Sequence, residues 1–218
     1  MEKTPGIPSL EAVDLHCTRG ERTLFGGLGF TLRGGELLRI GGANGSGKTS
    51  LLRIACGLLE PTGGTVRWGG EDVRRLQEEF WSRLVYIGHA NALKDDLTAT
   101  ENLRVACTLA GVGARNSQIV EALRLLGLNG FEHLPVRTLS QGQRRRVALA
   151  RLALSQAAPL WVLDEPFTAL DAAAMNCVQD LIGEHVSRGA AVMYTTHHEA
   201  RIAAAVSHRI DLDSEPTS

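Results

Sequence analysis

A glycine-rich loop at residues 42–49 constrains the fold of this chain more than any other stretch. It reads Gly42-Ala43-Asn44-Gly45-Ser46-Gly47-Lys48-Thr49, after the apolar run 37–40 and before a helix-like segment that begins at Ser50. The pattern G-x-x-x-x-G-K-[ST] between a strand and a helix is typical of a phosphate-binding loop. Its backbone N–H groups point at phosphate oxygens above the positive end of the following helix. The alternative, a chance glycine turn, is disfavoured by the strand before the loop and the helix after it.

The side chains of this phosphate loop indicate a nucleotide and a metal ion. Lys48 is expected to reach the β- and γ-phosphates, and the Thr49 hydroxyl is expected to bind Mg²⁺. The residues expected to hold the nucleotide are Gly42, Ala43, Asn44, Gly45, Ser46, Gly47, Lys48, Thr49 and Ser50.

Length and composition limit the remaining possibilities. A chain of 218 residues with 44% hydrophobic content can bury a sizeable core, so we expect one domain over residues 1–218. The formal net charge of −1 gives no sign of a nucleic-acid surface, so we expect no direct nucleic-acid partner. The arginine triplet, residues 144–146, is expected to lie on a solvated helix face. The apolar stretch 147–163 is interrupted by charged and proline residues and is not expected to span a membrane.

Hydrophobic periodicity and turn signals predict an α/β chain with an inserted helical segment at about 90–145. Thr98 followed three residues later by Glu101 is a capping box that opens a helix. Short antiparallel strands are expected at 10–13, around 24–25, at 30–32 and at 65–68. Buried strands are expected at 84–87, 160–163 and 190–194, with an edge strand at 208–212. Helices are expected at 98–110, 117–126, 141–155 and 172–187.

An acidic pair, Asp164 and Glu165, directly follows the apolar strand 160–163. Asp164 is expected to hold the water shell of the metal, and Glu165 is expected to orient or deprotonate an attacking water. Two carboxylates that merely end a strand in solvent are the alternative. The phosphate loop favours the metal-nucleotide interpretation.

The order of the motifs resembles the ATP-binding cassette family over nearly the whole chain. The motifs are the phosphate loop, L-S-Q-G-Q at 139–143 (the signature segment), L-W-V-L-D-E-P at 160–166, A-L-D at 169–171 and T-T-H at 195–197. On its own, Ser140 would predict only a helix N-cap. The resemblance implies an ATPase with a P-loop NTPase fold: a RecA-like core, an N-terminal antiparallel β-subdomain and an α-helical subdomain.

The same resemblance implies a second copy of the chain as a partner. ATP would be clamped between the phosphate loop of one copy and the signature segment of the other, with Ser140, Gly142 and Gln143 at the γ-phosphate. A helix N-terminus suits such an anion. His197 is implied as a further contact to the γ-phosphate and the attacking water, and Asp171 as part of the dimer contact.

Two positions depart from the family pattern. His89 stands where the family usually has a glutamine that contacts the metal, so it either ligates the metal or only forms hydrogen bonds there. The aromatic residue that usually stacks on adenine in the family has no clear counterpart near Arg19. The Arg19 guanidinium either stacks on the base instead or is an ordinary surface group.

A closer resemblance is to the ATP-binding subunits of bacterial haem exporters that serve cytochrome c maturation. It rests on E-R-T-L-F at 21–25, Y-I-G-H at 86–89, L-T-A-T-E-N-L at 97–103 and the run from Leu139 to Leu152. It implies docking on integral membrane subunits at the cytoplasmic face of the inner membrane, and hydrolysis that releases a haem-loaded chaperone. The surface expected to dock is the segment 89–96 (the docking segment) together with the helical insert.

Two other classes remain as alternatives. A soluble cassette ATPase acting on ribosomes or DNA would usually carry tandem cassettes or a strongly basic arm, and neither is present in this sequence. A small-molecule P-loop kinase would not need the signature segment.

Overall fold

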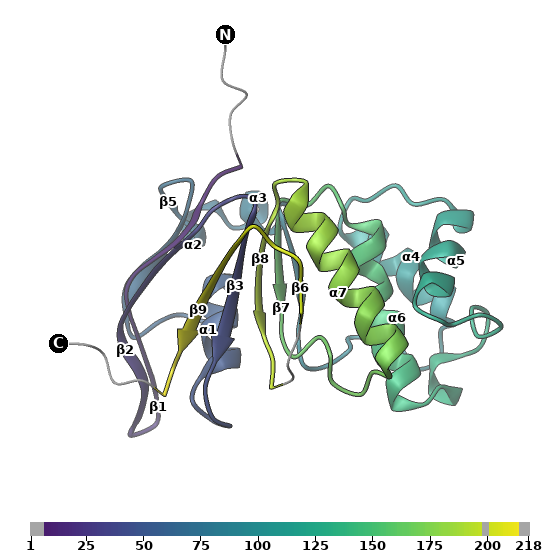
Figure 1. Ribbon diagram of the computed structural model, residues 1–218, viewed down its shortest axis with the longest axis horizontal. Helices are drawn as coiled ribbons and strands as arrows, with labels where there is room; N and C mark the ends of the chain where they lie inside the picture. Colours follow the sequence, from purple (N-terminus) through teal and green to yellow (C-terminus); the bar gives the residue numbers. More distant parts are fainter. Residues whose placement is uncertain (1–6, 198–200, 214–218) are drawn as a thin grey trace, which may run out of the picture.

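The computed structural model describes residues 7–197 and 201–213. An antiparallel sheet, a parallel sheet and a group of helices lie side by side along the long axis of the molecule (Figure 1). This arrangement confirms the expected α/β fold with an N-terminal β-subdomain and a helical subdomain.

The antiparallel sheet has the strand order β2-β1-β4-β5. Its strands are β1 (Leu10–Arg19), β2 (Arg22–Leu32), β4 (Gly63–Trp68) and β5 (Glu71–Asp72). The three short strands predicted before residue 33 were wrong in extent, because two long strands form one hairpin there. The glycines at 26, 27 and 29 lie inside β2, and the β1–β2 pairing absorbs them through shifts in register.

The parallel sheet has the strand order β6-β7-β8-β3-β9. Its strands are β3 (Glu36–Gly41), β6 (Leu84–Ile87), β7 (Leu160–Leu163), β8 (Ala191–Thr195) and β9 (Val206–Asp211). Leu160 and Val162 face the core shared with the antiparallel sheet, whereas Trp161 and Leu163 face the core under the helices. Both faces are therefore buried, which explains why the β7 sequence is continuously apolar.

The helical subdomain is inserted between β6 and β7. It contains α4 (Ala99–Leu109), α5 (Asn116–Leu125), the 3₁₀ turn η1 (Val136–Thr138) and α6 (Gln141–Leu154). The capping box predicted from Thr98 and Glu101 is present at α4. The helix α7 (Ala172–Ser187) has the predicted bounds and packs between β8 and α6.

The remaining helices include one predicted element and two that the sequence did not reveal. The helix α1 (Lys48–Ala55) follows the phosphate loop and packs its apolar face between the two sheets. The short helices α2 (Val73–Leu76) and α3 (Glu78–Trp81) had not been predicted, because four residues are too few to show a period. No helix within residues 7–197 and 201–213 is long and apolar enough to span a bilayer.

Four neighbouring strands of the parallel sheet end at one edge and bring distant residues together. The register pairs Ile40 with Thr195, Leu163 with Tyr194 and Ile87 with Leu163. The segments that follow β3, β6, β7 and β8 therefore meet at this edge, which is where open parallel sheets bind ligands. These segments are the phosphate loop, the docking segment, the acidic pair and the T-T-H motif.

Candidate active site

The phosphate loop requires glycine at the positions where the backbone turns. Gly42, Gly45 and Gly47 have φ angles of 134°, 81° and 104°, a region that side chains disfavour. A Cβ on Gly42 would lie 2.5 Å from Oγ of Ser46, so the turn also has no room for one. Gly47 caps α1 in the left-handed conformation, which aims the helix N-terminus at the loop.

Lys48 is buried beneath this loop and is folded back onto it. Its Nζ donates to the carbonyl oxygens of Gly42 (2.8 Å) and Ala43 (2.9 Å). An ammonium held by two neutral carbonyls can exchange them for the oxygens of an anion at little cost in hydrogen bonding. The backbone N–H of Ala43 donates to the carboxylate of Asp213, a contact that the sequence gave no reason to expect.

Asp164 joins the phosphate loop to the ends of β7 and β8. The Thr49 hydroxyl donates to its Oδ2 and the Thr195 hydroxyl to its Oδ1, each over 2.8 Å. The Asp164 residue is 1% exposed, so these hydroxyls provide hydrogen bonds that water would otherwise supply. The negative charge of Asp164 acts on Tyr86 as well: burial first, and then this charge, raise the pKa of Tyr86 to about 12.

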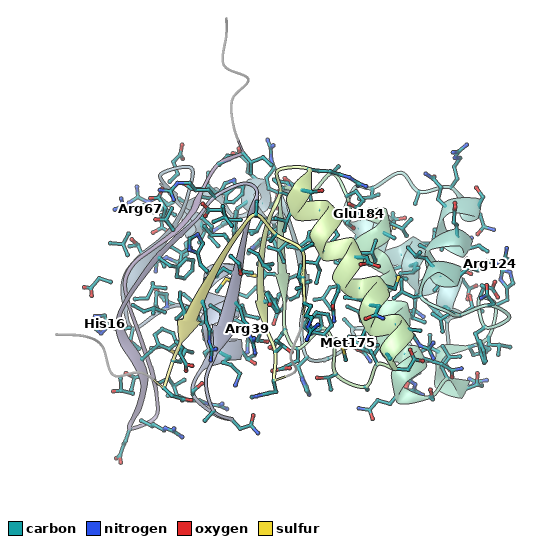
Figure 2. The ribbon with its side chains drawn as sticks, viewed as in Figure 1. His16, Arg39, Arg67, Arg124, Met175 and Glu184 are labelled. Carbon is teal, nitrogen blue, oxygen red and sulfur yellow. The ribbon has the colours of Figure 1, made fainter. Side chains whose placement is uncertain are left out.

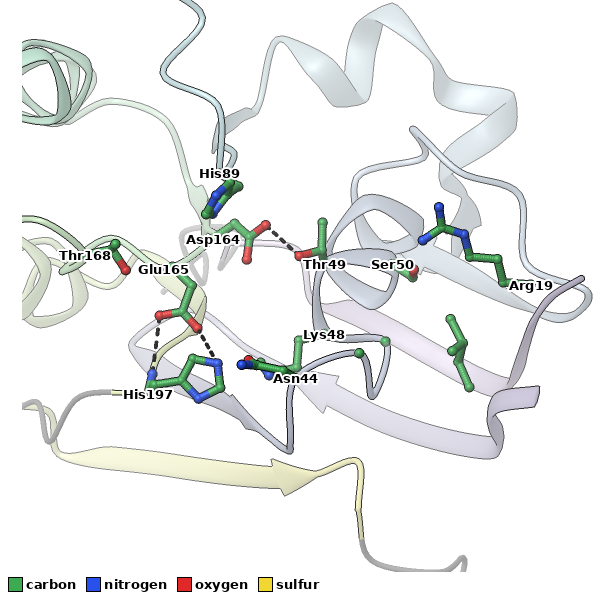
Figure 3. A pocket seen from close by; sticks show the side chains of 13 residues that line it. Arg19, Asn44, Lys48, Thr49, Ser50, His89, Asp164, Glu165, Thr168 and His197 are labelled. Atoms are coloured by element: carbon green, nitrogen blue, oxygen red, sulfur yellow. Dashed lines mark hydrogen bonds and ion pairs between the residues drawn. The ribbon is translucent and has the colours of Figure 1, made fainter. Parts of the chain in front are cut away.

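Glu165 contacts His197, the last residue of the T-T-H motif. His197 Nε2 lies 3.3 Å from Glu165 Oε1, and the His197 backbone N–H donates to Oε2 over 3.3 Å (Figure 3). Among the described residues, Oε1 has no hydrogen-bond partner of good geometry. This carboxylate oxygen therefore keeps acceptor capacity for a water molecule.

These groups border one cavity of about 390 Å³. The predicted nucleotide and metal residues that line it are Asn44, Gly45, Gly47, Lys48, Thr49, Ser50, His89, Asp164, Glu165 and His197. Arg19 also lines it, as do Leu24 and Thr168, which were not predicted as site residues. Only the sequence closeness of Leu24 to Arg19 and of Thr168 to the acidic pair could have suggested these two.

The signature segment lies outside this cavity. Ser140 is the N-cap of α6, and a capping box joins it to Gln143, whose N–H donates to the Ser140 hydroxyl. A Cβ on Gly142 would lie 2.7 Å from the carbonyl oxygen of Ala169, so glycine permits the close approach of α6 to the loop after the acidic pair. Ser140, Gly142 and Gln143 therefore lie at a helix N-terminus that does not border the cavity of their own phosphate loop.

The prediction of a solvated face for the arginine triplet was wrong. Arg144 donates to the carbonyl oxygens of Arg137, within η1, and of Leu139, directly after it. Arg145 is only 4% exposed. Arg144 and Arg146 are half-buried, so none of the three side chains lies on an exposed face of α6. A count of charges along the sequence does not reveal which helix faces other elements cover.

The loop, the acidic pair and their position at the carboxyl edge of a parallel sheet define a P-loop nucleotide hydrolase. The sequence profile of the ABC transporter family matches residues 25–168. The chain therefore belongs to the ABC transporter family and is an ATP-hydrolysing member of it.

Individual relatives agree with this assignment. The chain is 48% identical over 206 residues to the cytochrome c biogenesis ATP-binding export protein CcmA of Nitrosospira multiformis, covering 94% of this chain and 100% of that protein. It is 51% identical over 196 residues to the CcmA protein of Aromatoleum aromaticum, covering 90% and 92%. A solved dimeric bacterial ABC transporter cassette superposes with a TM-score of 0.81 at 25% identity, covering 95% of this chain and 97% of the other.

Proposed function

We propose that this chain is the ATPase subunit of a membrane export complex for cytochrome c biogenesis. The observation that carries the proposal is the cavity bordered by Lys48, Thr49, Asp164, Glu165 and His197, in a chain about half identical to proteins named for that export system. In this proposal the chain acts at the cytoplasmic face of the inner membrane, and hydrolysis drives release of a haem-loaded chaperone.

Nucleotide binding follows from the loop geometry. The N–H groups of the phosphate loop and the N-terminus of α1 receive the β- and γ-phosphates, and Lys48 transfers from carbonyl oxygens to phosphate oxygens. Arg19 and Leu24 border the far side of the cavity and are the groups available to the base.

The residues present fit Mg²⁺. Thr49 and Asp164 offer hard oxygen atoms, and the described residues contain no cluster of three or more His, Cys, Asp or Glu that would form a complete metal cage. That suits an ion that keeps several waters and takes its other ligands from phosphate oxygens. Bound Mg²⁺ would neutralise charge on the phosphates. His89 borders the same cavity and either ligates the metal or bonds to its waters.

Hydrolysis requires a base, and in this proposal Glu165 is that base. Its Oε1, which accepts no hydrogen bond of good geometry from the described residues, would accept a proton from the attacking water, and His197 beside the carboxylate would contact the γ-phosphate. The Ser140 end of α6 does not border the cavity of its own chain, and in this proposal it completes the site of a second copy. Dimeric structures of a related cassette support this arrangement.

The docking surface in this proposal is a groove of about 820 Å³ between α3, the docking segment, α4 and the end of α6. Its apolar wall includes Trp81, Val105 and Leu109, of which Leu109 is 84% exposed. Arg83, Lys94 and Arg151 line the same groove and add positive charge. The groove therefore fits an amphipathic helix with acidic residues, supplied by the membrane subunits.

Copurification tests the proposal. A tagged Glu165→Gln variant is expressed in the native host, membranes are solubilised in mild detergent with Mg-ATP, and copurifying integral proteins are identified by mass spectrometry. We expect the membrane subunits for cytochrome c maturation. A different permease would retain the transport motor and overturn the haem assignment, and absence of any integral protein would favour a soluble ATPase.

A second variant locates the docking surface. Leu109→Asp, placed in the tagged variant, should lose the membrane subunits because it puts a charge in the groove, and 84% exposure makes it harmless to folding. Leu58→Asp changes another exposed leucine outside the groove and should retain them. Equal recovery with both variants would contradict the proposed surface.

A further inference from the structure

Arg145 connects three segments that meet at the edge of the parallel sheet. Its Nη2 donates to the carbonyl oxygens of Asp164 (2.8 Å) and Glu165 (2.9 Å). Its Nη1 donates to the carbonyl oxygen of Gly88 (2.9 Å) and to Oδ1 of Asn91 (3.2 Å). One buried guanidinium therefore binds the backbone of the acidic pair and the start of the docking segment at the same time.

The backbone of Glu165 needs such support. Its φ angle is 48°, in the left-handed region that a glutamate rarely adopts and that costs about 1–3 kcal/mol. The surroundings hold it on both sides: its N–H donates to the Thr195 hydroxyl over 2.9 Å, and its carbonyl oxygen accepts from Arg145. The direction of the Glu165 carboxylate therefore depends on both contacts.

The charge of Arg145 suits this position. Burial lowers the pKa of its guanidinium, and the carboxylates of Asp164 and Glu165 oppose that change. An arginine remains charged under such conditions, and its planar fork matches several carbonyl oxygens at once. A lysine could satisfy only part of this set, since its ammonium is a single point of charge.

We propose that Arg145 is a positioning residue that holds Glu165 for hydrolysis and couples it to the docking segment through Gly88 and Asn91. The proposal rests on the proposed role of Glu165 as the base. A displacement of residues 88–91 by a docked partner would move the guanidinium, and the guanidinium would move the backbone of Glu165. Arg145 itself does not border the cavity that holds the nucleotide, so it should affect turnover and not nucleotide affinity.

Steady-state ATP hydrolysis and binding of a fluorescent ATP analogue by the purified full chain test this proposal. Arg145→Gln should lower kcat at least about tenfold and change nucleotide affinity by less than about twofold, because the phosphate loop is unchanged. Arg145→Lys should recover part of kcat. Asn91→Ala should lower kcat to a smaller degree. It should have no further effect in the Arg145→Gln background, since the proposed connection to Glu165 through the guanidinium has been removed.

Two controls distinguish this positioning role from a loss of stability and from an error in the identity of the base. Arg124→Gln removes a guanidinium from the buried Glu132 on the far side of the helical subdomain, so it measures lost stability alone and should leave kcat unchanged (Figure 2). Glu165→Gln tests the underlying function: if it keeps normal turnover, the role of Glu165 as base is wrong. If Glu165→Gln loses turnover while Arg145→Gln or Asn91→Ala keeps wild-type kcat, the positioning role is overturned. It is also overturned if the effects of Arg145→Gln and Asn91→Ala on kcat add in the double variant.

Discussion

Single residues in this chain carry chemistry through the partners that the fold brings to them. Lys48 and Glu165 both have contacts that a ligand or a water can replace or complete. The Lys48 ammonium donates to two neutral carbonyls, and Oε1 of Glu165 accepts no hydrogen bond of good geometry within the part of the chain that the structure describes. The positions of these residues at one cavity were predictable from local motifs, because each motif lies at the end of a strand. Arg145 was not predictable, because its burial results from contacts with residues 19 to 57 positions away.

Removing the Lys48 ammonium should weaken nucleotide binding. Lys48→Ala loses charge-assisted hydrogen bonds worth about 1.5–3 kcal/mol, so affinity for ATP should fall roughly 10- to 100-fold in calorimetry. Arg53→Ala is the matched control, since it removes an exposed cation from the same helix and should bind ATP normally. Normal affinity in Lys48→Ala would contradict the assignment of the phosphate loop.

His185 should make stability depend on pH. It is fully buried on α7, and its ring stacks on Trp161 with centroids 3.6 Å apart. Burial first, with Arg188 acting in the same direction, lowers its pKa from 6.5 to about 4. Between these values the unfolded chain binds a proton that the folded chain does not, so the free energy of unfolding falls as pH falls from 6.5 to 4, by at most about 3 kcal/mol.

Urea unfolding at about pH 7.5 and about pH 4.5 measures this effect. His185→Phe retains an aromatic ring against Trp161 but cannot titrate, so its stability should fall less over this interval than that of the wild type. Other titrating groups are common to both proteins and cancel in the comparison. The same loss of stability in both proteins would show that His185 is not responsible.

At the scale of elements, boundaries set by local chemistry were predictable and boundaries set by packing were not. The capping box at Thr98 and the N-cap at Ser140 fix the starts of α4 and α6, and both starts were predicted. The length of the β1–β2 hairpin was not, because the glycines in β2 read as breaks until a partner strand is present. The helices α2 and α3 likewise depend on contacts with β4 and β6.

Asn102 fixes the shape of the docking segment from within α4. Its Oδ1 accepts from the N–H of Lys94, and its Nδ2 donates to the carbonyl oxygens of Lys94 and Thr98. Asn102→Ala should cost about 1–3 kcal/mol of stability and speed amide hydrogen exchange at residues 94–98. Asn116→Ala alters an exposed asparagine on α5 and should do neither. Unchanged exchange in Asn102→Ala would mean that the segment is held by other contacts.

At the scale of the whole molecule, the proposed function requires a single chain to supply two separate parts of an ATP site. The cavity with Lys48 and Glu165 lies at the edge of the parallel sheet, and the Ser140 end of α6 lies outside it. The parallel sheet explains how four distant motifs meet, because the strands that precede them are neighbours and end at one edge. In the proposed function, a second copy brings its signature segment to this cavity.

Ser140→Arg tests that second copy. A bulky cation at the N-terminus of α6 would meet its positive end and block approach of another chain, so ATP hydrolysis should fall at least about tenfold. Binding of ATP to the phosphate loop of the same chain should persist. Thr138→Arg places the same side chain on the exposed turn η1 and should hydrolyse ATP normally. Full turnover in Ser140→Arg would place the complete site within one chain.

The most direct test of an ATP site shared by two copies is the mass of Glu165→Gln in solution, measured by light scattering with Mg-ATP and again with Mg-ADP. Without the base, ATP should remain uncleaved between two chains, so the mass with ATP should be about twice the 23.4 kDa of one chain and should return to one chain with ADP. One chain mass under both conditions, or a dimer that does not depend on the nucleotide, would contradict a site shared by two copies and hydrolysed through Glu165.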